Sequence, residues 1–177
     1  MNKKHYFISH NISLDAAESK LYGDITDDII TILTSQAVTV NNHKFCIIGS
    51  TFEEMELNEI WKINSFNVDP VTKKSFLSSL EHKKYPFYGI SFHPEKNAFE
   101  WVEGKNIPHT ANAILATQYF SNFFVNQCRK NDNKFPDKIM ENDHLIQNFN
   151  PFFTGKDAGS NFIQSYLFQS TTEDDGK

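Results

Sequence analysis

Short runs of apolar, or alternating apolar and polar, residues predict five strands in the central part of the chain. The runs lie at residues 37–40, 44–48, 61–69, 75–82 and 88–92. The third run ends at an Asp-Pro pair, which is typical of a turn. This part of the chain is therefore expected to form strands and hairpins.

Helical spacing of apolar residues predicts two helices. A shorter helix is expected at about 26–35, because Thr26 suits an N-cap and two acids follow it at the positive end of the helix dipole. Thr110 opens the longest predicted helix, whose apolar positions are expected to pack in the core. Those positions are Ala113, Thr117, Phe120 and Phe124, with Ile114 and Val125 beside them. The order of strands, hairpins and one long helix favours an α/β or α+β domain.

The C-terminal part of the chain has a different character. Residues 132–177 carry scattered proline and glycine residues and are expected to be mostly loop. A last strand is expected at 166–169, and residues 170–177 are expected to be disordered.

The composition indicates a packed globular protein. The chain has 177 residues, of which 39% are hydrophobic and 17 are Phe, and this is enough for one domain with a core. A net charge of -5, without a block of like charges, argues against nucleic acid as the partner. No apolar run approaches the roughly 20 residues of a membrane span. The N-terminus also lacks an apolar stretch long enough for a signal peptide.

The two cysteines show no pattern of a reactive or bridged pair. They do not form a C-x-x-C motif, and no glycines surround them as they would at a sharp turn that presents a nucleophile. Cys46 lies in the apolar run FCII, so a buried thiol is expected there, and Cys128 is interpreted in the same way.

The most informative chemistry follows the last predicted strand of the central part. The segment YGISF is followed at once by His93, Pro94 and Glu95. A histidine at the end of a strand can accept and return a proton near neutral pH, and a nearby carboxylate can fix its tautomer. Two other interpretations stay open, namely an exposed His and Glu without function, and a metal site. The further histidines considered as metal ligands are His43, His82 and His109, although no two histidines show a recognised metal spacing.

The longer segment YPFYGISFHPEKNAFEW, residues 85–101, closely resembles the signature of the γ-glutamyl hydrolases. This family hydrolyses folate polyglutamates and belongs to the class I glutamine amidotransferase-like cysteine hydrolases. Related amidotransferases share the G-x-x-F-H-P-E pattern, which Gly89 to Glu95 match here. Three further segments resemble the family, at residues 35–45, 107–131 and 150–155, so the similarity covers most of residues 11–169.

The resemblance implies a fold and a division of roles. The fold would be a flavodoxin-like α/β sheet flanked by helices, with residues 1–169 forming the C-terminal portion of one domain whose N-terminal part is missing. His93 would be the acid and base, Glu95 its orienting carboxylate, and His43 a substrate-binding histidine. Asn11 opens an Asn-Ile-Ser sequon at a position where family members often carry one, so glycosylation is expected there.

The family's nucleophile is a cysteine on a G-x-C-x-G type elbow, and no segment of this chain matches it. The chain alone is therefore expected to be inactive, with His and Glu supplied but no thiol nucleophile. The resemblance implies no metal and no cofactor. It implies a folate poly-γ-glutamate as the small-molecule partner, with a homodimer left open, and a lysosomal, vacuolar or extracellular location for the full-length family. The alternative is a truncated, non-catalytic family member with at most a binding role.

Overall fold

A computed structural model describes residues 6–8, 11–12, 18–43, 45–102, 105–156, 160 and 162–168, and for residues 6–8 and 11–12 it describes the backbone alone. The chain divides into two compact units, residues 1–131 and residues 132–177. The first unit holds every candidate site residue that the sequence analysis singled out.

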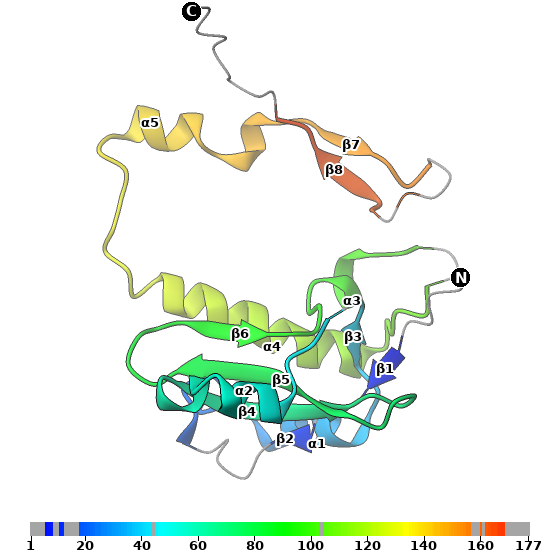
Figure 1. Cartoon of the computed structure of the whole chain (residues 1–177). Helices are drawn as coiled ribbons and strands as arrows, with labels where there is room; N and C mark the ends of the chain where they lie inside the picture. Colours follow the sequence, from blue (N-terminus) through cyan, green and yellow to red (C-terminus); the bar gives the residue numbers. More distant parts are fainter. Residues whose placement is uncertain are drawn as a thin grey trace, which may run out of the picture. The chain divides into compact units, whose positions relative to one another are not determined.

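The first unit combines small antiparallel sheets with helices (Figure 1). One sheet has four strands in the order β2-β4-β5-β6, and a separate pair is formed by β1 and β3. The elements in chain order are β1 (Tyr6–Ile8), β2 (Asn11–Ile12), α1 (Asp27–Ser35), β3 (Thr39–Asn41), α2 (Gly49–Glu54), η2 (Leu57–Glu59), β4 (Trp61–Val68), β5 (Ser75–His82), β6 (Tyr88–Ile90), α3 (Lys96–Phe99) and α4 (Ala111–Cys128).

The hairpin of β4 and β5 is the centre of the larger sheet, and its turn lies where the Asp-Pro pair predicted it. One Asp69 carboxylate oxygen accepts hydrogen bonds from the backbone N–H groups of Val71 (2.7 Å) and Thr72 (3.2 Å). Lys73 takes a positive φ of 59° to close the turn. The aspartate thus satisfies backbone donors that the reversal of the chain leaves free.

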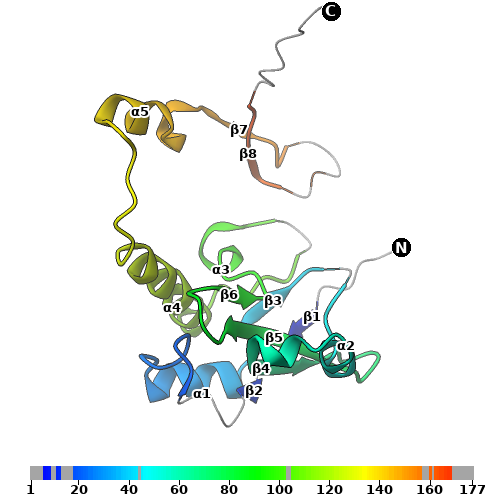
Figure 2. The same ribbon diagram turned by 60° about the vertical axis from the view of Figure 1, so that its left-hand side comes forward.

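The core lies between α1, α4 and the strands (Figure 2). The helix α4 begins directly after Thr110, as predicted, and the Thr110 side chain caps it by accepting a hydrogen bond from the Ala113 N–H. Phe120 meets the ring of Phe92 at 5.0 Å between centroids, and Phe123 meets Tyr88 at 4.8 Å. The helix α4 therefore buries its apolar face against the segment that leads to His93. The buried members of this face are Ala113, Ala116, Thr117, Phe120 and Phe123.

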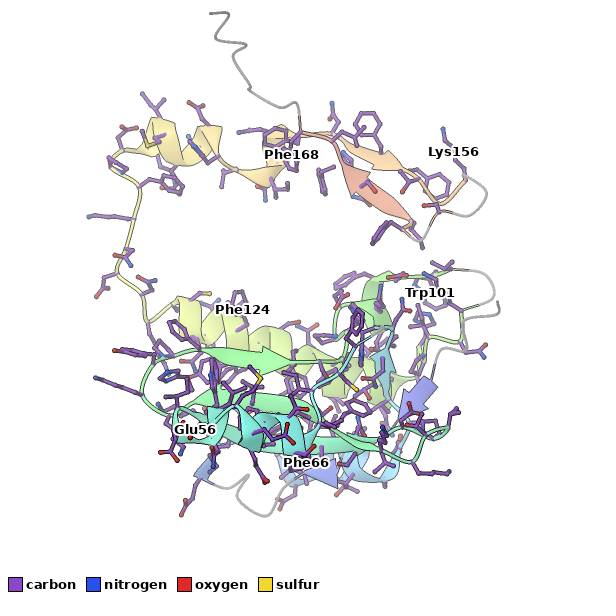
Figure 3. All side chains as sticks on the ribbon, viewed as in Figure 1. Glu56, Phe66, Trp101, Phe124, Lys156 and Phe168 are labelled. Carbon is purple, nitrogen blue, oxygen red and sulfur yellow. The ribbon has the colours of Figure 1, made fainter. Side chains whose placement is uncertain are left out.

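Two predictions of burial on α4 are wrong. Phe124 is 66% exposed and Val125 is 42% exposed, and Figure 3 shows the Phe124 side chain projecting from the helix. Phe124 and Val125 lie one and two positions after Phe123, which is the last member of the buried stripe after Phe120.

The segment 44–48 is not a strand in its described part, residues 45–48. It makes one backbone hydrogen bond to the sheet, from the Leu77 N–H to the Ile47 carbonyl (2.8 Å). Phe45 is 88% exposed, and Cys46 and Cys128 are both exposed, which corrects the expectation of two buried thiols. Cys46 is exposed because its segment runs along the sheet without being covered, and Cys128 because it ends α4 beyond the buried stripe.

The second unit has more regular structure than the sequence suggested. It contains α5 (Lys138–Asp143), η3 (Ile146–Asn148), and the antiparallel pair β7 (Pro151–Phe153) and β8 (Gln164–Tyr166). Asp137 caps α5 by accepting a hydrogen bond from the Met140 N–H at 2.8 Å. The strand expected at 166–169 is misplaced, since β8 shares only Tyr166 with it, and residues 167–168 are not in a strand. Residues 170–177, expected to be a disordered tail, lie outside the described residues.

Candidate active site

The backbone of His93 is fixed by the neighbouring strand β3. Its N–H donates a hydrogen bond to the Val40 carbonyl at 2.8 Å. Phe92, one residue earlier, is buried in the core, and β6 ends at Ile90. The strand predicted at 88–92 ends two residues early, so His93 lies three residues beyond the end of β6. Its backbone is held by the bond to Val40, and the Phe92 side chain before it is held in the core.

The side chains of His93 and Glu95 are in contact. Nδ1 of His93 lies 2.9 Å from Oε1 of Glu95, within the hydrogen-bond range that the His-Pro-Glu spacing predicted. The His93 side chain is 36% exposed and that of Glu95 is 59% exposed. The pair is thus reachable from solvent.

The protonation of the pair follows from its surroundings. Burial by itself would raise the pKa of Glu95, but the hydrogen bond from His93 and the nearby positive charges hold that pKa below its usual value. An ionised carboxylate only accepts hydrogen bonds, so Nδ1 of His93 must be the donor. Nε2 then carries the lone pair of the neutral ring, and it has no hydrogen-bond partner among the described residues. The arrangement leaves a basic nitrogen free to take a proton.

The short helix α3 behind the pair is braced by buried polar contacts. Asn97, fully buried, donates from Nδ2 to the carbonyls of Val38 (2.9 Å) and Pro108 (2.8 Å). His109 donates from Nδ1 to the Asn97 carbonyl at 2.7 Å, and its ring stacks on Trp101 with centroids 3.6 Å apart. These contacts hold the residues that follow Glu95 against the segments that directly precede β3 and α4.

The sequence analysis missed a row of charges beside the pair. Lys96 is 7% exposed, and its Nζ pairs with Glu100 Oε2 and lies 4.0 Å from Glu95 Oε1. Lys105 is a second cation beside Glu100, with its Nζ 3.4 Å from Glu100 Oε1. The spacing of Lys96 and Glu100 by four residues is a signal that the sequence contains, although it does not reveal that the lysine is buried.

The histidines weighed as metal ligands serve separate local contacts. His82 Nδ1 accepts hydrogen bonds from the backbone N–H groups of Lys84 and Tyr85, both at 3.0 Å. His109 bonds to Asn97, as described above. Among the residues that the structure describes, no group of three or more His, Cys, Asp or Glu side chains is placed to hold a metal ion.

His43 lies in a different cavity from the pair. Its Nδ1 donates to the Phe45 carbonyl at 2.8 Å, and its Nε2 lies 3.3 Å from Asn41 Oδ1. The cavity, of about 340 Å³, is lined by segment 45–47, strand β5 and residues 89–91, which directly precede the His93 segment. His93 and Glu95 are not among its lining residues. The role of His43 in substrate binding therefore stays a prediction.

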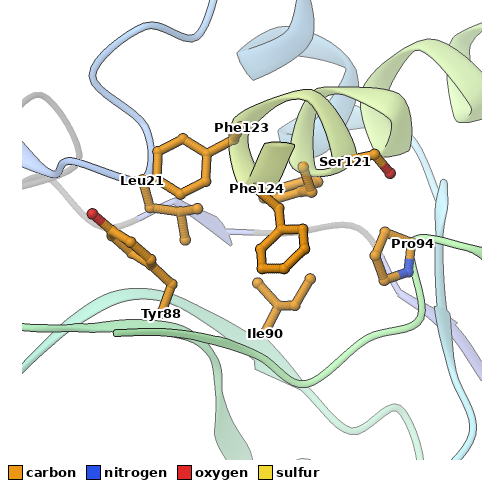
Figure 4. Close-up of a pocket in the computed structure, with 8 residues that line it drawn as sticks. Leu21, Tyr88, Ile90, Pro94, Ser121, Phe123 and Phe124 are labelled. Carbon is orange, nitrogen blue, oxygen red and sulfur yellow. The ribbon is translucent and has the colours of Figure 1, made fainter. Parts of the chain in front are cut away.

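A second cavity, of about 250 Å³, lies between α4 and β6 (Figure 4). Phe123 and Phe124 reach from the helix toward Tyr88 and Ile90 of the strand, and Pro94 closes one side. This cavity touches the His93–Glu95 segment only through Pro94. Its lining is almost wholly apolar.

Comparison with known proteins identifies the relatives of this chain. It is 39% identical to gamma-glutamyl hydrolase B of Dictyostelium discoideum over 172 residues, which are 97% of this chain and 49% of the relative. It is 35% identical to the gamma-glutamyl hydrolase of Rattus norvegicus, over 89% of this chain and 49% of the relative. The chain is a homologue of the gamma-glutamyl hydrolases. This confirms the resemblance inferred from residues 85–101.

The extent of the match has two further features. The chain spans about half the length of the curated gamma-glutamyl hydrolases that it matches; for the human enzyme, at 34% identity, the share is 46%. No family model matches the chain.

The thiols of this gamma-glutamyl hydrolase homologue stand apart from the candidate pair. Cys46 lines the cavity that contains His43, and Cys128 is the last residue of α4. Neither thiol forms a hydrogen bond with His93 in the part of the chain that the structure describes. The sequon cannot be compared with its prediction, because the Asn11 side chain and Ser13 lie outside the described residues.

Proposed function

We propose that this chain forms part of a γ-glutamyl hydrolase that cleaves γ-linked glutamate from folate polyglutamates, with His93 as acid and base and Glu95 as its orienting carboxylate. The observation that carries the proposal is the 2.9 Å contact between His93 Nδ1 and Glu95 Oε1 beyond the end of β6. It leaves Nε2 free in the tautomer that proton transfer requires. The homology to gamma-glutamyl hydrolases supports the choice of reaction.

The proposed chemistry needs a thiol that neither Cys46 nor Cys128 supplies. Nε2 of His93 would take the thiol proton as the sulfur attacks the γ-glutamyl amide carbon. The same proton would pass to the leaving amine as the C–N bond breaks, which leaves a thioester. Water would then attack the thioester, lose a proton to His93 and release the thiol and the free carboxylate. The thiol in this scheme lies outside residues 1–177.

Further details belong to the same proposal. His43 would bind substrate, since its cavity is walled by the residues that immediately precede the His93 segment. The scheme uses no metal and no cofactor. The described sheets are antiparallel, so a glutamine amidotransferase-like fold would require strands in addition to the pairings seen here. Residues 1–169 would then be part of one such domain, and a lysosomal, vacuolar or extracellular location would follow the family. Among the described residues, no helix is long and apolar enough to cross a membrane.

The test is a chimera in which residues 1–177 replace the matched half of the Dictyostelium relative. The chimera should release glutamate from a folate polyglutamate, followed by chromatography. Replacing His93 with Ala should lower kcat by roughly 10²–10⁴-fold, the range for general acid–base catalysis. His144→Ala is the matched control, because His144 is exposed in the second unit and should leave kcat unchanged.

Three more variants of the chimera separate the roles. Glu95→Gln should lower kcat in the same direction as His93→Ala, whereas His43→Ala should raise KM more than it lowers kcat. Replacing both Cys46 and Cys128 with Ser should leave turnover intact. Loss of turnover on changing either cysteine would contradict the proposed external thiol, and full turnover by His93→Ala would contradict the role of the pair.

A non-catalytic role is the second candidate, and the separation of both cysteines from His93 favours it for the chain by itself. Residues 1–177 incubated alone with a folate polyglutamate should then release no glutamate but should still bind the substrate, measured by calorimetry. Glutamate release by this chain alone would overturn this second candidate. Binding that disappears in His43→Ala would support it.

A further inference from the structure

Lys96 is an unusual residue to find next to an exposed pair of polar side chains. It is the first residue of α3 and follows Glu95 directly, yet it is 7% exposed. An ammonium group loses much of its hydration on burial, and this cost is offset only by counter-charges and hydrogen bonds. The carboxylates around Lys96 are therefore what keeps it in place.

The Lys96 ammonium has two carboxylate partners, one directly before it in the sequence and one four residues after it. Glu100 Oε2 accepts its hydrogen bond, and Glu95 Oε1 lies 4.0 Å away. The same Glu95 oxygen lies 2.9 Å from His93 Nδ1. One oxygen atom thus faces both the imidazole and the buried ammonium, which couples the position of the carboxylate to Lys96.

Glu100, which pairs with Lys96, is itself held by a second cation, Lys105. Glu100 is 15% exposed at its side chain, and its other oxygen lies 3.4 Å from Lys105 Nζ, whose side chain is 13% exposed. Charges therefore alternate from His93 through Glu95, Lys96 and Glu100 to Lys105. The last three members of this row, Lys96, Glu100 and Lys105, are shielded from water, and charges interact more strongly there than at the surface.

A simple helix-stabilising pair would look different. Exposed lysine and glutamate four residues apart stabilise a helix only slightly, and their charged ends stay in water. Here the ammonium is buried, α3 has only four residues, and the helix is already held by Asn97 through two backbone carbonyls. The placement of Lys96 is better explained by what its charge does to Glu95.

We propose that Lys96 is a positioning residue for the His93–Glu95 pair, whose buried ammonium holds the Glu95 carboxylate ionised and directed at His93 Nδ1. Its catalytic consequence rests on the function proposed above, but the structural effect does not. Without the ammonium, the 59% exposed Glu95 side chain has no cation on its inner side and can turn to water. His93 would then lose the acceptor that selects its tautomer.

The first experiment measures Glu95 in residues 1–177 by NMR titration of its side-chain carboxyl carbon. Lys96→Met removes the charge and keeps the length of the side chain, and it should shift the Glu95 midpoint upward. Lys96→Arg should restore a midpoint close to wild type. Lys105→Met is the matched control, because it removes a cation from the same row without facing Glu95, and it should shift the midpoint less than Lys96→Met does.

A second variant covers the case in which Lys96→Met does not fold. Glu100→Gln leaves Lys96 with Glu95 as its remaining carboxylate partner in the row, so the Glu95 midpoint should move downward. An unchanged midpoint in both Lys96→Met and Glu100→Gln would overturn the proposal. Equal upward shifts in Lys96→Met and Lys105→Met would overturn it as well, because the effect would then be that of the whole row.

The catalytic consequence is tested in the chimera described above. Lys96→Met should lower kcat by roughly 10–10²-fold, since misplacing a catalytic arrangement by about 1 Å can cost 10²-fold, and should change KM little. Lys96→Arg should recover most of the loss. An inactive parent chimera would count against the proposed hydrolase function and leave the carboxyl titration to decide on Lys96. An active parent with full kcat in Lys96→Met would count against the positioning role alone.

Discussion

Replacing Glu81 with Gln should destabilise the first unit, because this carboxylate is the centre of a buried network. Glu81 is 4% exposed on β5. Its Oε2 accepts hydrogen bonds from Ser19 Oγ (2.8 Å), the Leu21 N–H (3.0 Å) and Asn64 Nδ2 (3.1 Å), and Oε1 accepts one from the Lys20 N–H (3.2 Å). One side chain thus fastens the segment before α1 to the sheet.

The magnitude follows from this count of donors. A glutamine oxygen can replace Oε2, but its three hydrogen bonds then go to a neutral acceptor, and a hydrogen bond to a charged group is worth about 1 kcal/mol more than a neutral one. The glutamine NH₂ faces the Lys20 N–H, which loses its acceptor at a cost of about 1 kcal/mol. Burying a neutral amide in place of a charge recovers part of the loss. The expected net destabilisation is about 2–3 kcal/mol, or roughly 5–10 °C in Tm for a chain of this size.

The pH dependence has a definite sign. Burial alone would raise the pKa of Glu81, but the hydrogen bonds from Leu21, Ser19, Lys20 and Asn64 outweigh it and hold that pKa below its usual value. A lowered pKa in the folded state means that the stabilisation is present above the unfolded-state value and is lost as the pH falls through the folded-state value. The difference between wild type and Glu81→Gln should therefore be full at pH 7 and should shrink below about pH 4.5.

Urea unfolding at pH 7 and at pH 4 measures both effects, with Glu54→Gln as a control. Glu54 is an exposed carboxylate on α2, and its replacement should change the free energy of unfolding by no more than about 0.5 kcal/mol. The reasoning would be refuted by a Glu81→Gln variant as stable as wild type at pH 7. A stability difference that grew as the pH fell would refute the assigned direction of the pKa.

Two further predictions concern α4 and the thiols. Thr110→Ala should lower the free energy of unfolding by about 1 kcal/mol, because the Ala113 N–H loses its cap, whereas Thr110→Ser should stay near wild type in the same urea measurement. Both Cys46 and Cys128 are exposed, so a chromogenic disulfide reagent should titrate two thiols in the folded protein without denaturant, and one thiol in Cys46→Ser. A titration that required denaturant would show that either thiol is covered.

The parts of the fold that could be predicted from the sequence are those set by neighbours along the chain. Asp69 and Thr110 accept hydrogen bonds from backbone N–H groups two to three residues away, so the turn and the cap depend on the local sequence alone. The contact of His93 with Glu95 also spans two residues, with a proline between them. Such features do not depend on how distant segments pack.

The parts that could not be predicted depend on distant partners. Glu81 lies in a run read only as a strand, and its partners Ser19 and Leu21 are 62 and 60 residues away in sequence. The apolar run around Cys46 resembles a buried strand, but burial requires a covering layer, and Phe45 remains 88% exposed. Lys96 shows the same limit, since its four-residue spacing from Glu100 predicts an ion pair but not a buried one.

The strand β3 and its flanking residues connect the parts of the candidate site. Val40 of β3 accepts the hydrogen bond from the His93 backbone at 2.8 Å. Val38, directly before β3, accepts one at 2.9 Å from Asn97, which anchors the helix behind Glu95. His43 follows the same strand by two residues. The segment 38–43 thus binds the His93 backbone and anchors α3, and it also carries the histidine proposed to bind substrate, 50 positions before His93 in the sequence. A substrate held by His43 would therefore be placed relative to His93 through this segment, together with Phe45, whose carbonyl accepts the hydrogen bond from His43 Nδ1.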